Sequence, residues 1–299
     1  MTTPSQNLLV WKRRLPGLIM SAPAVIVFVA MFIVPMGLAV VLSLTNWNGY
    51  SLNLNFIGFE NYLKAFSNPR TIDAAVFTLK IAFFGTLFCN AIGLGIAALI
   101  SGPGKPNVLA RTVFFYPYTI SALIIGFLWS AMLAPQGVVN NLLSHAGMAP
   151  LPFLTEPSFA QATVVATVVW SHFGFNMILY IAGLKSIPAE YYEASTIDGA
   201  SRWDQFRYIT FPMLAPIVTV NLVLSLVGFL KVYEVALALT AGGPAGSTQT
   251  IVFQILSDSF ANGKLGFGAA QSVILLVVTA VLGLAVTLSR RGAERKVTD

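Results

Sequence analysis

The sequence predicts an all-α integral membrane protein with six transmembrane helices. Charged residues make up 9% of the chain and hydrophobic residues 56%, whereas an average soluble domain is about 25% charged. The apolar residues form six stretches, each long enough for the roughly 20 residues that a hydrocarbon core requires. We therefore expect a membrane domain over residues 15–289, between polar tails at 1–14 and 290–299.

The first span is delimited by charge. No charged residue appears between the basic cluster at 12–14 and Glu60, and the first span lies in this interval, roughly over 16–44. This apolar run is much longer than the roughly 7–15 residues of a signal peptide, so we expect a helix that is retained. Pro23 and Pro35 lie within it, which membrane helices tolerate when neighbouring groups satisfy the freed backbone.

Five further apolar stretches follow the first. A loop rich in glycine and proline ends the second stretch, and loops with turn-forming residues separate the others. The loop at 134–157 contains neither lysine nor arginine, and the loop at 241–266 contains only Lys264. The expected spans are 74–100, 113–133, 159–184, 217–240 and 267–288.

Lysine and arginine are distributed unequally among the loops. Because cytoplasmic loops carry the excess of these residues, the richer set of loops is expected to be cytoplasmic. Both termini and the loop at 185–216 belong to that set. Its residues are Lys12, Arg13, Arg14, Lys105, Arg111, Lys185, Arg202, Arg207, Arg290, Arg291, Arg295 and Lys296, and the opposite set holds only Lys64, Arg70 and Lys264.

The residue patterns of an enzyme are missing from the sequence. Its one cysteine, Cys89, excludes a disulfide within the chain and a cysteine metal site. No nucleophile stands beside a base, no carboxylates have metal-ligand spacing, and no Gly-Lys-Ser/Thr phosphate loop is present. We expect no catalysis, cofactor or metal in this chain, and no nucleic-acid partner, because membrane topology accounts for the net charge of +6.

Polar side chains inside the spans are candidates for a solute path, because an ionisable group in hydrocarbon costs at least a few kcal/mol. Lys231 and Glu234 stand three residues apart in the fifth span, so they pair with each other or border a polar passage. Lys80 is expected to extend toward the outer interface. The candidate path residues are Asn176, Tyr180, Asn221, Lys231, Tyr233 and Glu234.

The fourth span carries a second polar pattern. His172 and Asn176 are four residues apart, and Tyr180 follows one turn later. A proton relay is disfavoured, because the chain has two histidines and only one lies in a span. Hydrogen bonding between helices or the lining of a cavity is the favoured interpretation.

The segment 185–216 is polar between two apolar stretches and holds four of the chain's 11 acidic residues. Pro188 stands where a helix can begin, and Asp198 with Gly199 offers a turn whose glycine can adopt a positive φ. Ser201 and Asp204 have the spacing of a capping box. The pattern predicts a helical hairpin in contact with water or another protein.

The second helix of this hairpin carries bulky side chains at steps of three and four residues. Such spacing places them on one face of a helix, and that face requires a groove or a partner. The residues concerned are Trp203, Phe206, Thr210 and Met213.

The hairpin resembles the cytoplasmic coupling loop, or Glu-Ala-Ala loop, of binding-protein-dependent ABC importer permeases, in the Asp-Gly-Ala version of sugar importers. Similar segments at 55–62, 111–117 and 242–244 extend the resemblance over nearly the whole chain. Ser195 stands where alanine is usual, and Phe211 stands where leucine is usual. The residues that carry the resemblance are Glu193, Ala194, Ser195, Gly199, Ile209, Phe211 and Pro212.

The resemblance implies a non-catalytic permease subunit of an ATP-driven importer, similar to maltose and other carbohydrate systems, in a bacterial or archaeal plasma membrane. The implied partners are a second related permease, two cytoplasmic ATPases that carry ATP and Mg²⁺, an extracytoplasmic binding protein, and membrane lipid. The residues expected to couple the chain to the ATPases are Glu190, Glu193, Ala194, Asp198, Gly199, Ala200, Trp203, Phe206, Ile209 and Pro212.

Three alternatives are distinguishable. An importer of a glycerol-phosphate-type solute would share the architecture, and Lys231 would serve the phosphate. A self-sufficient secondary transporter would show repeated halves and an ion-coupling carboxylate in mid-membrane, for which only Glu234 is available. A membrane scaffold would bind a soluble protein through 185–216 without transport. Co-purification of ATPases separates an importer from the last two.

Overall fold

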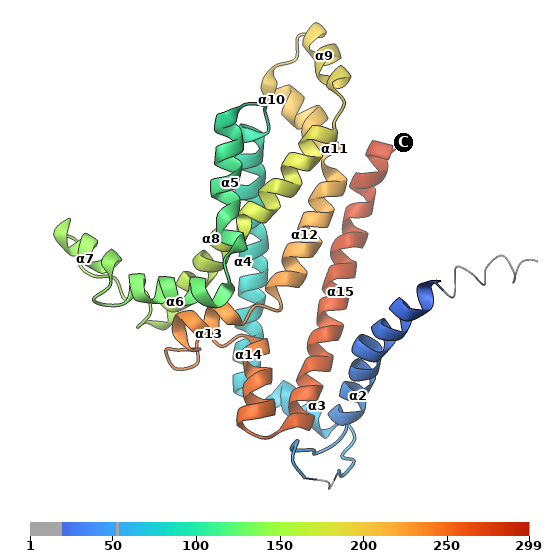
Figure 1. Ribbon diagram of the computed structural model, residues 1–299, viewed down its shortest axis with the longest axis vertical. Coiled ribbons are helices and arrows are strands. Elements are labelled where there is room, and N and C mark those ends of the chain that lie inside the picture. Colours follow the sequence, from blue (N-terminus) through green and yellow to red (C-terminus); the bar gives the residue numbers. More distant parts are fainter. Residues whose placement is uncertain (1–19, 52–53, 299) are drawn as a thin grey trace, which may run out of the picture. The chain divides into compact units, whose positions relative to one another are not determined.

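The computed structural model describes residues 20–51 and 54–298 (Figure 1). The expectations for the basic cluster at 12–14, and for the side chains of Arg295 and Lys296, lie outside this description. Every named element in the described part is a helix, and an isolated bridge joins Thr45 to Phe56. Five helices are long and apolar enough to cross a membrane, or six if one bent pair is counted as a span. The all-α membrane prediction is confirmed.

The chain divides into two compact units, the first within 1–65 and 258–273. Its apolar helix runs over Met20–Ser43, with the π-helix η1 at Val29–Ile33 followed by α2 at Val34–Ser43. The π-helix ends two residues before Pro35, whose missing amide interrupts the regular α-helical hydrogen bonds.

Buried polar side chains hold the turn after α2. The Nδ2 of Asn61, at the start of α3 (Glu60–Ser67), donates to the carbonyl oxygens of Ser43 at 2.9 Å and Thr45 at 2.8 Å. The Ser43 hydroxyl lies 2.7 Å from the Tyr62 hydroxyl. In the π-helix η3 (Ser257–Ala261), Asp258 accepts from Gln271 at 3.1 Å. These bonds satisfy backbone and side-chain groups where the chain leaves its helices.

The second unit, within 66–257 and 274–299, is organised around α8 (Pro157–Ser186). In the most apolar 18-residue stretch of α8, 61% of the residues are buried, against 28% in that of α4 (Pro69–Ile100). Figure 1 shows α4 and α5 beside α8, and both helices pack against it. The remaining helices of this unit are α5 (Lys105–Thr119), α6 (Ala122–Leu133), α7 (Val138–His145), α9 (Ala189–Ile197), α10 (Arg202–Gln205), the π-helix η2 (Phe206–Thr210), α11 (Phe211–Met213), α12 (Ala215–Phe229), α13 (Glu234–Thr240), α14 (Ile251–Leu256) and the later part of α15 (Leu265–Thr298).

The third and fifth expected spans are not single helices, so their predicted continuity is wrong. Extended backbone at Ile120 and Ser121 separates α5 from α6, and the segment 230–233 separates α12 from α13. The later halves pack together, and Figure 1 shows α6 and α13 running across the direction of α4. Hydropathy did not signal the breaks, because both lie within predominantly apolar stretches.

Close helix contact depends on Gly174 in α8, whose backbone lies against α5. A side-chain carbon there would overlap the Phe114 carbonyl oxygen, which cannot move without displacing α5. Gly95, in the last third of α4, has no heavy atom within 4 Å of the corresponding position. The two glycines differ in contact, although both lie inside long helices.

We expect Gly174→Ala to lower the free energy of unfolding by about 2 kcal/mol or more, because the extra carbon overpacks the α5–α8 contact. Gly95→Ala should be neutral or stabilising by up to about 1 kcal/mol, since alanine is the better helix former. Thermal unfolding of the two purified variants in detergent measures the difference. Equal melting temperatures would contradict the close contact.

Candidate functional site

The hairpin between α8 and α12 has the predicted helix, turn and helix. Pro188 directly precedes α9, and Gly199 adopts a φ of +79° after it. The amide of Gly199 donates to the Thr196 carbonyl at 3.1 Å, and that of Ala200 donates to the Ser195 carbonyl at 2.9 Å. This pair of bonds is a Schellman motif, which satisfies the last carbonyls of α9 and requires the left-handed residue at Gly199.

The capping box predicted at the second helix is present. The Asp204 amide donates to the Ser201 hydroxyl oxygen at 3.2 Å, and the Ser201 amide donates to the Asp204 carboxylate at 3.1 Å. The Ser201 hydroxyl also donates to that carboxylate. Hydrogen bonds from the Ser201 side chain, and then from its backbone, hold the pKa of Asp204 below its ordinary value. Asp204 is therefore ionised at neutral pH, next to the positive end of the helix.

Polar contacts join the two helices of the hairpin. The Gln205 Nε2 donates to the hydroxyl oxygens of Ser195 and Thr196, each at 3.0 Å. The hydroxyls of Tyr192 and Thr210 lie 2.8 Å apart. Ser195, which departs from the alanine usual in the motif, therefore gains a hydrogen bond between helices rather than merely filling space.

The bulky residues of the second helix differ in exposure. Trp203 is exposed, Phe206 and Met213 are half-buried, and Thr210 is buried. The π-helix η2 lies between Trp203 and Met213 and locally changes the 3.6-residue period on which the predicted shared face was based.

The hairpin presents an exposed surface of apolar and acidic side chains. Ile197 is 88% exposed and Trp203 is 66% exposed, and the Trp203 ring stacks on Phe206 at 5.8 Å. Exposed apolar side chains in a cluster are typical of a protein-binding surface. Of the coupling residues expected from the sequence, Glu190, Glu193, Ala194, Asp198, Gly199 and Trp203 are exposed, and Ala200, Phe206, Ile209 and Pro212 are half-buried.

A second candidate site lies where the broken spans meet α8. Tyr118 at the end of α5 stacks on Phe175 at 4.9 Å and meets the edge of His172 at 5.6 Å. The His172 ring in turn meets Phe229, the last residue of α12, at 5.3 Å. We call these four residues the aromatic cluster. It brings together two helix ends and the middle of α8.

His172 has a defined orientation in the aromatic cluster. Its Nδ1 lies 3.0 Å from the Val168 carbonyl oxygen and 2.8 Å from the Ser171 hydroxyl. In the tautomer with the proton on Nδ1, the ring donates to the Val168 carbonyl and keeps a lone pair on Nε2. In that tautomer the ring can accept a hydrogen bond from a hydroxyl group through Nε2.

Sequence analysis singled out His172 but missed Tyr118, Phe175 and Phe229. Within the cluster, Tyr118 is 39% exposed, whereas Phe229 is 2% exposed. In an apolar stretch, the sequence does not distinguish an aromatic residue of a binding site from an aromatic residue of the hydrophobic core. The only clue was the polar His172 in mid-span.

Asn176 and Tyr180, two of the candidate path residues, lie instead in a buried network between helices. Asn176 donates to the Ser225 hydroxyl at 2.7 Å, and the Tyr180 hydroxyl donates to Asn90 at 2.7 Å. Asn90 also reaches Ser225 at 3.4 Å. The network joins α4, α8 and α12, as the interpretation of hydrogen bonding between helices predicted. Asn221, a third candidate, is 0% exposed.

The remaining candidates lie at the break after α12. Lys231 falls in a turn and Glu234 begins α13, so the helical face that they were expected to share does not exist. Both are exposed, and within residues 20–51 and 54–298 the recorded ion pair joins Lys64 to Glu60. Of the two alternatives for these residues, the Lys231–Glu234 ion pair is not formed among the described residues. Tyr233 is half-buried at the same break.

Comparison with known families gives a match to one described as "Binding-protein-dependent transport system inner membrane component" over residues 90–299. The chain is 31% identical over 263 residues to the probable starch degradation products transport system permease protein AmyD of Thermoanaerobacterium thermosulfurigenes, covering 88% of this chain and 89% of that protein. It is 33% identical over 277 residues to the sn-glycerol-3-phosphate transport system permease protein UgpA of Pectobacterium atrosepticum, covering 92% of each.

Solved structures give the same picture for the fold. A chain of a bacterial ABC transporter involved in the import of the acidic polysaccharide alginate matches with a TM-score of 0.82 and 26% identity. That match covers 96% of this chain and 98% of the other. The alginate transporter has also been solved in complex with an alginate pentasaccharide-bound periplasmic protein.

Proposed function

The chain belongs to the family of binding-protein-dependent transport system inner membrane components, and from this premise we propose how it works. It is a permease subunit of an ABC importer. We propose that it forms half of a pathway for a sugar or sugar-like solute. The aromatic cluster carries this proposal, because aromatic rings and a few oriented polar groups suit a hydroxylated solute. AmyD and the alginate transporter, whose names refer to carbohydrates, support the same class.

The position of the aromatic cluster suits a transport site. His172 is close to the midpoint of α8, which extends over Pro157–Ser186 and is long enough to span the membrane. Transporters commonly bind solute near the bilayer midplane, between helices that are interrupted there. Here α5 and α12 both end at the cluster. A glycerol-phosphate solute is the alternative, favoured by the similarity to UgpA and by the exposed Lys231 beyond Phe229.

The proposed complex has a second, related permease, two cytoplasmic ATPases and an extracytoplasmic binding protein. ATP and Mg²⁺ would be held by the ATPases, and this chain would take no part in hydrolysis. The alginate transporter solved with its periplasmic protein supports the role of a binding protein. The exposed hairpin surface with Ile197 and Trp203 is the proposed ATPase contact.

Coupling would follow a continuous path along the chain. The helix over Arg202–Met213 meets α12 at an angle of 64°, with the buried Leu214 between them. From there α12 extends to Phe229 in the aromatic cluster. A force on the hairpin would therefore reach the solute site through one helix, which is the kind of element that a two-state transporter shifts.

The orientation proposed from the charge distribution places both termini and the hairpin in the cytoplasm of a bacterial or archaeal cell. In a background where the buried Cys89 is replaced, we expect Gln136→Cys to react with a membrane-impermeant maleimide in intact cells. Lys105→Cys should react only after permeabilisation. Both positions are exposed, so access depends on sidedness. Labelling of Lys105→Cys in intact cells would show that the orientation is the opposite of the proposed one.

The solute site is tested at Tyr118. We expect Tyr118→Ala to raise the half-saturating solute concentration about tenfold, which corresponds to about 1.4 kcal/mol of lost stacking. Tyr118→Phe should retain most of the affinity. The readout is solute-stimulated ATP hydrolysis by the complete complex, with a panel of sugars and glycerol-3-phosphate.

The control for that experiment is Tyr116→Ala. Tyr116 lies on the same helix and is 63% exposed, and it takes no part in the aromatic cluster. An equal effect of Tyr116→Ala and Tyr118→Ala would contradict the assignment of the cluster as the solute site. If glycerol-3-phosphate alone stimulated ATP hydrolysis, the solute would be of the glycerol-phosphate type and not a sugar.

Coupling is tested at Gly199, where an added side chain would meet no atom of this chain within 4 Å. Gly199→Trp should leave the spans inserted but weaken ATPase retention about tenfold, because the indole would collide with a protein docked there. Gly199→Asn is the matched control, since asparagine tolerates the left-handed conformation and is small. Co-purification and uptake assays measure both. Wild-type uptake by Gly199→Trp with ATPases firmly bound would remove the coupling role.

A further inference from the structure

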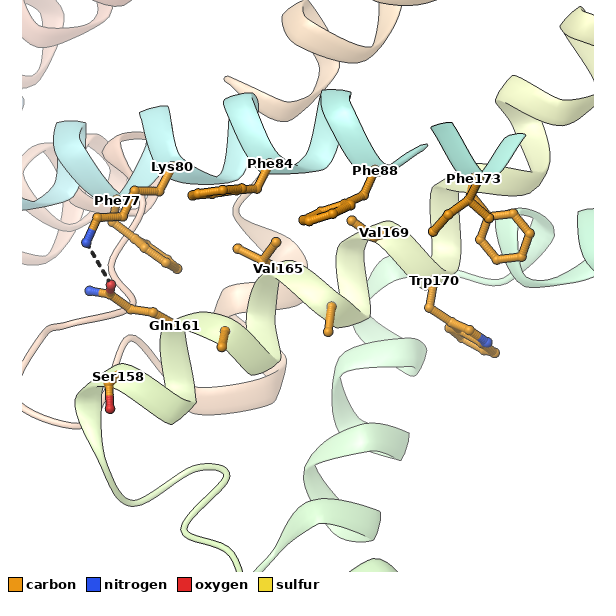
Figure 2. A pocket seen from close by; sticks show the side chains of 13 residues that line it. Phe77, Lys80, Phe84, Phe88, Ser158, Gln161, Val165, Val169, Trp170 and Phe173 are labelled. Atoms are coloured by element: carbon orange, nitrogen blue, oxygen red, sulfur yellow. Dashed lines mark hydrogen bonds between the residues drawn. The ribbon is translucent and has the colours of Figure 1, made fainter. Parts of the chain in front are cut away.

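An apolar groove runs between α4 and α8, on a face that the aromatic cluster does not use (Figure 2). Its volume is about 720 Å³, within the range of about 300–1,000 Å³ for ligand sites. Figure 2 shows Phe84 and Phe88 of α4 facing Val165 and Val169 of α8 across it. The Phe84 and Phe88 side chains remain 41% and 45% exposed.

One end of the groove is polar. There the Lys80 Nζ donates to the Gln161 Oε1 at 3.0 Å, and the Gln161 Nε2 donates to the Ser247 carbonyl at 2.8 Å. The opposite end is formed by Trp170 and Phe173 (Figure 2). The groove is therefore amphipathic along its length, with its cation at one end.

The length of the groove matches one leaflet of a bilayer. From Lys80 to Ile92 an α-helix rises about 18 Å, and from Gln161 to Phe173 the rise along α8 is the same. Half of a hydrocarbon core is about 15 Å thick. With the middle of α8 at the bilayer centre, Lys80 and Gln161 lie at the boundary with the headgroups and the aromatic end lies near the centre.

The charge at that boundary lacks an acidic protein partner in the described part of the chain. The recorded contact of the Lys80 ammonium there is the neutral Gln161 amide, and the recorded ion pair is between Lys64 and Glu60. An ammonium group has three donors, so Lys80 can donate hydrogen bonds to further oxygen atoms. A cation at the headgroup boundary attracts an anionic lipid by about 1 kcal/mol.

We propose that this groove is a binding site for an anionic phospholipid. One acyl chain lies along Phe84, Phe88 and Val169, and the phosphate binds the Lys80 ammonium beside Gln161. In the proposed orientation the lipid belongs to the outer leaflet. The groove has one positive charge at its polar end, and its apolar part is as long as one leaflet is thick. These features suit a lipid better than a helix of a partner subunit, which would continue past both ends.

The test uses Trp170 as a reporter in the complete complex, reconstituted in vesicles with brominated lipid, which quenches nearby tryptophan. The Trp170 signal is the difference between the parent and Trp170→Phe. We expect dibrominated phosphatidylglycerol to quench it at about fivefold lower mole fraction than dibrominated phosphatidylcholine, the factor expected for one lysine.

Variants at the cation decide the outcome. Lys80→Gln should remove the preference for phosphatidylglycerol, and Lys80→Arg should retain it, so a folding defect of one variant does not hide the result. Lys264→Gln is the matched control, because it deletes an exposed lysine outside the groove. Quenching of Trp170 by neither lipid would mean that a partner subunit fills the groove. Equal quenching by both lipids in the parent would remove the anionic site.

Discussion

Backbone hydrogen bonding is the constraint on which the arrangement of the second unit depends. A backbone amide or carbonyl without a partner costs several kcal/mol in hydrocarbon, so a helix break must be covered by protein or line a wet cavity. The breaks at Ile120–Ser121 and at 230–233 both lie in stretches that the sequence makes apolar. Their later halves, α6 and α13, pack on each other and against α8. The most buried helix, α8, is therefore the one that shields the two breaks.

The same constraint explains which parts of the fold the sequence could predict. Span existence follows from hydropathy, and the hairpin follows from local signals, because Gly199 and the Ser201–Asp204 box act within a few residues of themselves. Hydropathy did not predict the break after α12, since Leu230 and Val232 on either side of Lys231 are as apolar as their helical neighbours. The position of both breaks is decided by packing between α6 and α13, which are far apart in the sequence.

The residues of the candidate sites also differ in how far the sequence could predict their contacts. Sequence analysis favoured amide and charged side chains for the path, because their cost in hydrocarbon marks them out. The structure uses Asn176 and Tyr180 to fasten α4, α8 and α12 together, where each polar group finds a partner. The aromatic cluster is assembled from three helices by ring contacts, and no linear pattern records such contacts. A polar residue in these spans can therefore serve to hold helices together and need not line the solute path.

Two polar residues of α12 differ in their hydrogen bonding. Its Ser225 is tied into the polar network, whereas Asn221, one turn earlier, is fully buried with neither its amide nitrogen nor its carbonyl oxygen hydrogen-bonded in the described part. Leaving such groups unmet costs about 1–3 kcal/mol each. That cost falls on the helix that links the hairpin at Leu214 to the aromatic cluster at Phe229. A conformation of α12 in which the Asn221 amide gains hydrogen-bond partners would recover this free energy, so the Asn221 side chain favours a second position of α12.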